Sequence, residues 1–262
     1  MHAQRRVSQS RPVALVTGAA RRIGRSIAID LAQHGWDVAV HYHHSVEDAQ
    51  TVLDEITGLG GRAVGVRADL SSEEQTVSLI SEAASELGPV VCLINNASVF
   101  EDDRVLATTR ESWDRHLNVN LRAPLVLTEA FARQLPQSAC GNVINLLDQR
   151  VWRPTPYFLS YTVSKVGLWS LTQTLAMALA PSIRVNAIGP GPTLASVHQT
   201  AEQFARQCAR TPLARQVQLT EICSAVRFLL DAPSITGQMI AIDAGQHLGW
   251  MGAGSVSPVD EK

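Results

Sequence analysis

The sequence predicts a single doubly wound α/β domain, with about seven strands in a parallel sheet and helices on both faces. Short apolar runs alternate with amphipathic stretches from one end of the chain to the other. The apolar runs are continuous rather than alternating, which is typical of strands buried on both faces. The chain has 262 residues, 45% of them hydrophobic, which is enough for one large core and excludes a disordered chain.

Seven apolar runs are expected to be strands, and the stretches between them predict helices. The strands are Val13–Val16, Val38–Val40, Ala63–Val66, Val90–Ile94, Val143–Leu147, Ile183–Ile188 and Met239–Ile242. The first helix has an apolar stripe of Ile23, Ile27 and Leu31 and is expected to end at Gly35. Long helices are expected at about 105–136, 159–180 and 219–231.

Two more helices are expected to begin at capping pairs, Ser45 with Asp48 and Ser71 with Glu74, and the second runs to Leu87. A serine followed three residues later by an acidic residue can satisfy free N–H groups of a first turn. The chain shows neither an internal repeat nor a linker. We therefore expect one domain over residues 12–250, a flexible leader at 1–11 and a tail at 251–262.

The composition excludes several classes of function. A net charge of −2 argues against a dedicated nucleic-acid-binding protein, which would normally have an excess of basic residues. There is no run of 18 apolar residues to span a membrane, and the first eleven residues lack the apolar core of a secretory signal. The cysteines have no disulfide-like or metal-like spacing and are expected to be reduced thiols of a cytoplasmic protein. They are Cys92, Cys140, Cys208 and Cys223.

Lysine is almost absent from this chain. Of 22 basic side chains, 20 are Arg, and the two lysines are Lys165 and the C-terminal Lys262. Where a positive charge alone suffices, this sequence uses Arg. Only an ammonium is a compact donor with an adjustable pKa, so Lys165 is singled out as a candidate functional residue.

The turn after the first strand, Thr17–Gly24, predicts a phosphate-binding loop. Gly18 and Gly24 allow the backbone to approach a pyrophosphate at the N-terminus of a helix. The first 25 residues also contain six Arg, including Arg21 and Arg22, and no acidic residue. An ordinary strand–helix turn is the alternative, but the position after the first strand of a doubly wound sheet favours a dinucleotide.

The end of the second strand predicts which dinucleotide binds. It reads His41, Tyr42, His43, His44 and Ser45, with no carboxylate until position 47. An acidic residue there would bind the ribose hydroxyls of NAD, so its absence beside basic groups favours NADPH over NADH. A metal site is the less favoured alternative, because successive side chains of a strand point to opposite faces.

Tyr161 and Lys165 are one helical turn apart, and therefore share a helix face. A phenol has a pKa near 10, and an adjacent ammonium is expected to lower that pKa toward the range needed for proton transfer. The ammonium can also bind ribose hydroxyls. A surface pair with no function is the alternative for this spacing taken alone.

Six short motifs follow one another along the chain. They are Thr17-Gly18…Gly24, Asp69-Leu70, Asn95-Asn96-Ala97-Ser98, Asn120, Tyr161-xxx-Lys165 and Pro190-Gly191-Pro192. In this order the sequence resembles the short-chain dehydrogenase/reductase family over residues 12–250. The resemblance implies a homotetramer and a substrate lid at about 193–211.

Two departures from the usual family pattern are similar to the pteridine reductase branch, which includes dihydromonapterin reductases. Arg22 replaces a glycine, and Asp148 stands thirteen residues before Tyr161, where a catalytic Ser is usual. That resemblance implies that Arg22 contacts cofactor phosphate and substrate and that Phe100 stacks on a pterin. A serine suits a ketone oxygen, whereas reduction of a C=N bond requires a proton at nitrogen, which Asp148 beside Tyr161 could supply.

The expected mechanism is hydride transfer from NADPH to a dihydropterin, with protonation by Tyr161 and Asp148. Lys165 would bind the nicotinamide ribose, Asn120 would support it through a water, and Ser98 with Arg22 would bind the polar edge of the pterin. The expected cofactor-binding residues are Gly18, Arg21, Arg22, Ile23, Gly24, His41, Tyr42, His43, Ser45, Asp69, Leu70, Asn96, Ala97, Ser98, Tyr161, Lys165, Pro190 and Gly191.

Two other readings remain open from the sequence. A carbonyl reductase acting on a ketone, sugar or 3-oxoacyl thioester would share the fold, although Asp148 argues against it. A non-catalytic NADP-binding sensor would not need the set of Tyr161, Lys165 and Asn120.

Overall fold

The computed structural model describes residues 11–196 and 199–249. It contains one sheet of seven parallel strands in the order β3-β2-β1-β4-β5-β6-β7. The strands are β1 Val13–Val16, β2 Asp37–Tyr42, β3 Ala63–Arg67, β4 Val90–Asn95, β5 Gly141–Leu146, β6 Ile183–Pro190 and β7 Met239–Ile242. The predicted fold class is confirmed.

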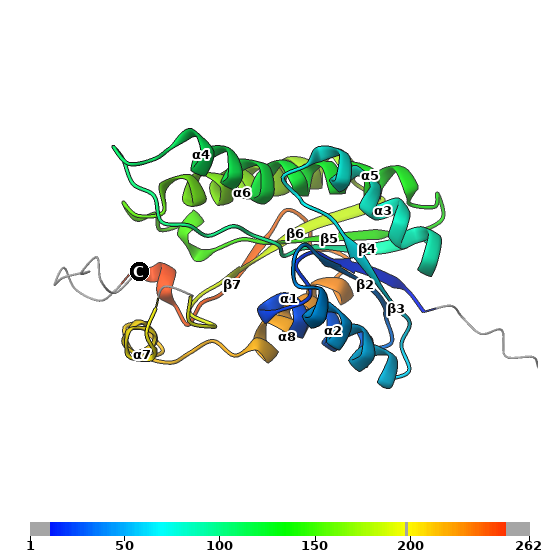
Figure 1. Cartoon of the computed structure of the whole chain (residues 1–262), viewed down its shortest axis with the longest axis horizontal. Helices are drawn as coiled ribbons and strands as arrows, with labels where there is room; N and C mark the ends of the chain where they lie inside the picture. The colour runs from blue at the N-terminus through cyan, green and yellow to red at the C-terminus, as the bar shows by residue number, and fades with distance from the viewer. Residues whose placement is uncertain (1–10, 197–198, 250–262) are drawn as a thin grey trace, which may run out of the picture.

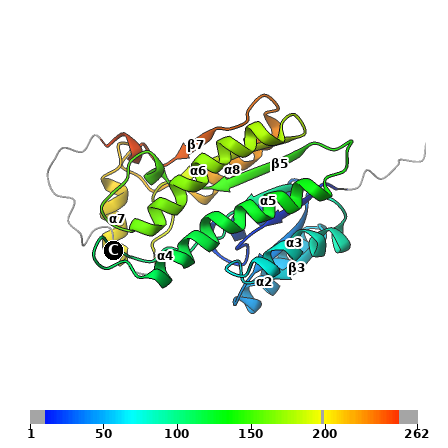
Figure 2. The same ribbon diagram turned by 90° about the horizontal axis from the view of Figure 1, so that it is seen from above.

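Helices cover both faces of the sheet (Figures 1 and 2). One face carries α1 Arg22–Gln33, α2 Val46–Gly58 and α8 Leu219–Asp231. The other carries α3 Glu73–Leu87, α4 Arg110–Leu117, α5 Ala123–Gln134 and α6 Leu159–Leu179. Helix α7, Ala201–Ala209, lies beyond the carboxyl ends of the strands at one end of the molecule. Among the described residues, no helix is long and apolar enough to cross a membrane.

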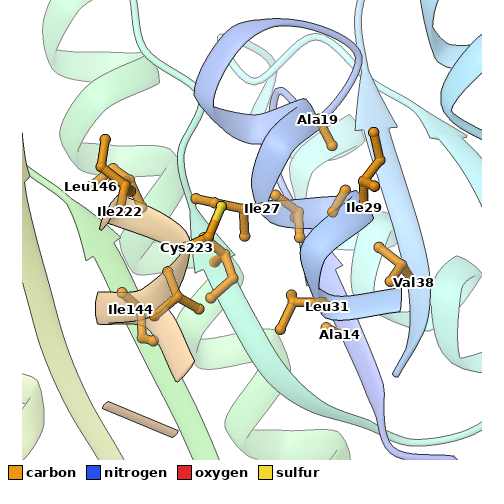
Figure 3. Packing of buried hydrophobic residues seen from close by; sticks show 14 of the residues in the cluster. Ala14, Ala19, Ile27, Ile29, Leu31, Val38, Ile144, Leu146, Ile222 and Cys223 are labelled. Atoms are coloured by element: carbon orange, nitrogen blue, oxygen red, sulfur yellow. The ribbon is translucent and has the colours of Figure 1, made fainter. Parts of the chain in front are cut away.

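The core consists of two layers, one on each side of the sheet. Along β1, Ala14 and Val16 pack in the layer of α1 and α8, whereas Val13 and Leu15 pack in the layer of α3 and α5. All four are buried, which explains why this strand is a continuous apolar run. Figure 3 shows the first layer, where Ile27 of α1 and Cys223 of α8 meet above the strands.

Strand order reverses at β1, because the chain adds β2 and β3 on one side of it and β4 to β7 on the other. In open parallel sheets, the crevice at the carboxyl ends beside such a reversal is where ligands bind. The loops after β1, β4, β5 and β6 therefore meet at one edge, and they carry Thr17, Asn96, Asp148 and Gly191.

Three local predictions differ from the structure. The helix expected at 105–136 is interrupted, because α4 begins only at Arg110 and a wider π-helical turn, Asn118–Arg122, separates it from α5. Ser45 precedes α2 without a capping hydrogen bond, since Asp48 instead accepts from Arg21 Nε at 2.6 Å. Helix α3 is capped by Ser72, not Ser71: the Ser72 hydroxyl accepts from the Gln75 N–H, while Ser71 binds Asp69.

The four cysteines are unpaired, with Cys140 exposed and the other three buried. Nearly all of the predicted leader (residues 1–10) and the whole of the tail at 251–262 lie outside the described residues.

Candidate active site

Two adjoining cavities occupy the crevice at the carboxyl edge of the sheet. The larger, about 800 Å³, lies over the phosphate loop and the ends of β2 and β3. The smaller, about 240 Å³, lies over the ends of β5 and β6 and under residues 193–207. Six residues line both: Arg22, Ile23, Asn96, Ser98, Phe100 and Tyr161. The two cavities therefore form one continuous site with a junction at Tyr161 and Phe100.

The phosphate loop is tied to the end of β4. Thr17 Oγ1 accepts from the N–H groups of Asn96 and Ala97 at 2.9 and 3.0 Å, and Asn96 Nδ2 donates to the Thr17 carbonyl at 2.8 Å. A Cβ at Gly24 would lie 2.3 Å from the Gly18 carbonyl oxygen, so only glycine can stand there. The loop leaves a backbone cradle at the N-terminus of α1, as a phosphate site requires.

His41 holds this loop rather than facing solvent. Its Nδ1 accepts from the Gly18 N–H at 3.0 Å, and its Nε2 lies 3.2 Å from the Ala68 carbonyl oxygen. Burial lowers the pKa of His41 to about 4, so the ring is neutral. His41 was expected to bind the cofactor, but both of its ring nitrogens bind groups of the protein, so its side chain positions the loop and is not free to bind a phosphate.

The neighbouring residues divide between cavity and core. His43 and His44 line the larger cavity, with His43 Nε2 3.9 Å from Asp69 Oδ2. Tyr42 packs against the core layer, and Ser45 directly precedes α2. Neither of these two lines the cavities, so their expected cofactor contact is not supported by the structure. The remaining predicted residues of the cofactor site all line one or both cavities.

Arg22 joins the phosphate loop to the expected lid. Its guanidinium donates to the carbonyl oxygens of Ala195 and Leu194 at 3.0 and 3.2 Å. Its backbone has φ +56°, a left-handed conformation that suits the glycine usually found there. Six residues between 193 and 207 line the smaller cavity: Thr193, Leu194, Ser196, Gln199, Phe204 and Gln207. Residues 197–198 of this segment lie outside the described residues.

Tyr161 and Asp148 form a hydrogen-bonded pair at the junction of the cavities. The phenol donates to Asp148 Oδ2 at 2.9 Å, and Asp148 Oδ1 accepts from the Arg150 N–H at 2.8 Å. Burial, and then the charge and hydrogen bond of Asp148, raise the pKa of Tyr161 well above 10. The phenol is therefore protonated and available as a donor.

Lys165 lies behind this pair, buried, with Nζ donating to the Leu146 carbonyl at 2.8 Å. Burial lowers the pKa of Lys165 to about 8, although the charge of Asp148 opposes the shift. The expectation that the ammonium lowers the pKa of Tyr161 is wrong. Burial of the phenol, and then the Asp148 carboxylate that it contacts, raise this pKa, whereas Lys165 Nζ is 5.8 Å from the centre of the Tyr161 ring.

Asn120 is buried in the π-helical turn and fixes the loop after β4. Its Oδ1 accepts from the Val99 N–H at 2.8 Å and from Ser98 Oγ at 3.2 Å. Its Nδ2 donates to the Val99 carbonyl at 2.9 Å and to Ser164 Oγ at 3.1 Å. These protein partners show how Asn120 positions the loop that carries Phe100, and the expected water link to Lys165 stays a prediction.

Phe100 lies at the junction in a cluster of aromatic rings. It stacks on Phe158, with ring centres 4.2 Å apart and an angle of 11° between the planes. It also meets the Tyr161 ring edge-on, with centres 4.7 Å apart. Phe158 thus contacts Phe100, whereas two neighbouring aromatic residues pack elsewhere: Trp152 contacts His247, and Tyr157 lies against Arg104.

A buried network behind Phe100 was not predicted. Ser160 donates to Asp103 Oδ2 at 2.5 Å, and its N–H donates to Asp103 Oδ1 at 3.0 Å. The same hydroxyl lies 2.7 Å from His116 Nδ1, and His116 Nε2 accepts from the Glu101 N–H. The loop from 98 to 103 is thus held at one end by Asn120 and at the other by this network.

The sequence also missed much of the smaller cavity. Three lining residues, Gln199, Phe204 and Gln207, fall in the expected lid but were not named individually. Gln149, Arg150 and Gln246 were not expected at all. Gln149 and Arg150 had a usable signal, because they directly follow Asp148 at the end of a central strand.

Comparisons with known proteins agree with this geometry. A family model described as enoyl-(acyl carrier protein) reductase matches residues 18–247. The 3-oxoacyl-[acyl-carrier-protein] reductase FabG of Staphylococcus aureus is 33% identical over 240 residues, which are 90% of this chain and 98% of that protein. A short-chain dehydrogenase from Burkholderia cenocepacia in complex with NADP is 33% identical, with a TM-score of 0.84, over 90% of this chain and 97% of its own.

Two crystal structures of FolM alternative dihydrofolate reductase 1, each with NADP, are 46% identical to this chain. The one from Brucella suis has a TM-score of 0.87 and covers 92% of this chain, and the one from Brucella canis has a TM-score of 0.88 and covers 94%. Each match spans 98% of the compared chain. The chain is an enzyme that belongs to the short-chain dehydrogenase/reductase family of oxidoreductases.

Proposed function

We propose that this protein is an NADPH-dependent reductase that converts dihydropterins to tetrahydropterins. The observation that carries the proposal is the 2.9 Å hydrogen bond from the Tyr161 phenol to the Asp148 carboxylate, at a position where the family usually has Ser. The 46% identity to the Brucella dihydrofolate reductases supports the same substrate class.

The residues of the larger cavity fit NADPH. The Gly18–Gly24 loop lines this cavity at the N-terminus of α1 and would hold the pyrophosphate there. His43, His44 and Arg21 lie where a 2′-phosphate would bind, and Asp69 with Leu70 would flank the adenine. NADPH, when bound, supplies the hydride. A Michaelis constant for NADH at or below that for NADPH would overturn this assignment.

The chain's own residues then provide the proton and hold the substrate. Because burial and Asp148 keep the Tyr161 phenol protonated, this phenol holds a proton that it can donate to a ring nitrogen. Lys165 lies one turn away to bind ribose hydroxyls. Phe100 offers a flat apolar face beside Tyr161, which favours a heterocycle over a flexible acyl chain. Arg22 and Ser98 line both cavities and are proposed to bind the polar edge of the pterin.

A second candidate is reduction of a 3-oxoacyl thioester, which the identity to FabG favours. Against it stands Asp148, because a carboxylate facing a developing alkoxide would destabilise that charge. The rate of NADPH oxidation distinguishes the two candidates. It is measured separately with dihydrobiopterin, dihydromonapterin, dihydrofolate and an acetoacetyl thioester. Turnover of the thioester alone would reject the pterin proposal. No turnover of any of these substrates would reject both proposals.

We also propose that the protein is a cytoplasmic homotetramer in which residues 193–211 close over the substrate. Two exposed apolar surfaces support assembly. One is a groove between α4, α5 and α6, lined by Leu117, Leu121, Leu125, Gly167 and Leu171. The other is the face of α8 beside β7, where Phe228 is 53% exposed. The unpaired cysteines suit a reducing compartment.

A further inference from the structure

His41 lies near the carboxyl end of β2, between two loops that border the larger cavity. Because β2 is flanked by β1 and β3 in the sheet, the phosphate loop after β1 is on one side of His41. The loop after β3, residues 68–70, is on the other side, and we call it the adenine loop. Gly18 of the first loop and Asp69 and Leu70 of the second line the cavity together with His41. His41 therefore lies between the residues assigned to the pyrophosphate and those assigned to the adenine.

The side chain of His41 is bonded to both loops. Its Nδ1 accepts from the Gly18 N–H at 3.0 Å, so the proton of the neutral ring is on Nε2, which lies 3.2 Å from the Ala68 carbonyl oxygen. A neutral imidazole has one acceptor and one donor nitrogen. This ring uses the acceptor on the phosphate loop and the donor on the adenine loop. His41 is 2% exposed, so both bonds are shielded from water.

The backbone of His41 strengthens the link to the phosphate loop. Its carbonyl oxygen accepts from the Ala19 N–H at 2.8 Å. The N–H groups of Gly18 and Ala19 are thus bound by His41, and those left for a pyrophosphate are at the start of α1, which no side chain caps. Gly18 has φ +62°, a left-handed conformation. Loss of the Nδ1 acceptor would leave the Gly18 N–H without a partner and release this turn to shift.

We propose that His41 is a positioning residue for NADPH: it fixes the loop that binds the pyrophosphate relative to the loop that flanks the adenine. The inference rests on the proposed placement of NADPH in the larger cavity and not on the identity of the reduced substrate. A ligand that spans both loops should therefore depend on His41, whereas a ligand without the pyrophosphate should not.

The test compares two fragments of the cofactor. 2′-Phospho-ADP-ribose contains the adenine, the 2′-phosphate and the pyrophosphate, and adenosine 2′-monophosphate lacks the pyrophosphate. His41→Leu removes both bonds and keeps a side chain of similar bulk. We expect it to raise the Kd, measured by calorimetry, about 10-fold for NADPH and for 2′-phospho-ADP-ribose, but less than about 2-fold for adenosine 2′-monophosphate. His34→Leu, at the exposed C-terminal end of α1, should leave all three constants unchanged.

His41→Asn is the conservative variant. Its Oδ1 takes the place of Nδ1 and can accept from the Gly18 N–H, whereas the Ala68 carbonyl loses its donor. The Kd for NADPH is expected to lie between those of the wild type and His41→Leu, and kcat at saturating NADPH should stay within about 2-fold of the wild type. This variant provides the same comparison of fragments should His41→Leu not fold.

Two results would overturn the inference. Equal losses for the two fragments would place His41 against the adenine end alone, and unchanged Kd values in a folded variant would leave it a structural role only. The binding constants require no substrate, so a wild-type enzyme that reduces no dihydropterin would reject the proposed function without changing them.

Discussion

The Tyr161–Asp148 pair is the residue-scale feature that sets the proposed chemistry. A buried phenol beside a carboxylate keeps its proton, because ionisation would put two negative charges 2.9 Å apart. A serine in place of Asp148 would leave the phenol without that charge. Burial and Asp148 therefore keep the proton on Tyr161, so the phenol holds the proton that a ring nitrogen would receive.

Tyr161→Phe removes the donor hydroxyl and keeps the ring. We expect kcat with a dihydropterin to fall about 10²- to 10⁴-fold, the usual contribution of a positioned acid, while the Kd for NADPH measured by fluorescence stays close to that of the wild type. Tyr157→Phe is the matched control, since Tyr157 lies against Arg104 outside both cavities. Equal turnover in Tyr161→Phe and the control would reject the role given to Tyr161.

Lys165 gives a prediction for the pH dependence of stability. Its pKa falls from 10.5 to about 8 on folding, so the unfolded chain binds more protons between these values. Stability from this group is therefore lowest below pH 8 and recovers as the pH rises toward 10.5. Relative to Lys165→Met, the wild type should gain about 2 kcal/mol in free energy of unfolding between pH 7 and 9.5. Urea titrations of both proteins measure this difference, and a constant difference would show that Lys165 has an ordinary pKa.

The sequence showed which residues form the site, but not how the protein shifts their pKa values. The spacing of Tyr161 and Lys165 predicted a shared helix face, and both are buried at the site. The pKa of Tyr161 is raised by burial of the phenol and by a carboxylate at the end of β5, and both are set by tertiary packing. His41 shows the same limit, because a basic residue at a strand end gives no sign of whether it faces solvent or the core.

At the scale of elements, the loop from 98 to 103 is positioned by the helices that flank it. Asn120 in the π-helical turn holds its first residues, and Asp103 joins its end to Ser160 at the start of α6. Phe100 lies between these two anchors, against Phe158 and Tyr161. A rigid loop fixes the ring that would stack on substrate.

Ser160→Ala tests this arrangement, because it leaves Asp103 and His116 without their shared partner. We expect the protein to lose about 1–3 kcal/mol of stability and the KM for dihydropterin to rise roughly 3- to 10-fold, with less change in kcat and none in NADPH binding. Gln173→Ala, on the exposed side of the same helix, should change neither constant. A loss of stability without a change in KM would assign Ser160 a structural role only.

The order and type of the elements were predictable, whereas their ends were less so. Apolar runs such as Val13–Val16 identify strands because both faces of the sheet are covered. The π-helical turn at Asn118–Arg122 was not visible in the sequence, since its apolar pattern continues that of α4 and α5. Ser71 and Ser72 are both possible caps, and only the backbone of the preceding turn selects the second.

For the whole molecule, the parallel sheet brings six distant motifs to one edge, so the location of the site follows from the fold. The outer lining of the substrate cavity does not, because Gln149, Gln199, Gln207 and Gln246 come from segments with no motif in common. Among these four, only the position of Gln149 at the cavity follows from the strand order, because it directly follows Asp148 at the end of β5.

The exposed apolar surfaces give the prediction for the assembled molecule. Multi-angle light scattering is expected to report the mass of four 28.3-kDa chains. Phe228→Asp and Leu121→Asp, one on each apolar surface, should each reduce this mass, because a charge would be buried in an interface. A wild-type monomer would show that neither surface joins copies of this chain.

The central claim is the substrate class, and one ratio tests it most directly. It is the kcat/KM for 7,8-dihydrobiopterin divided by that for acetoacetyl thioester, measured with saturating NADPH. We predict a ratio of about 100 or more for the wild type and a much lower ratio for Asp148→Ser, in which the residue usual for ketone reduction is restored. A wild-type enzyme that prefers the thioester would contradict the account.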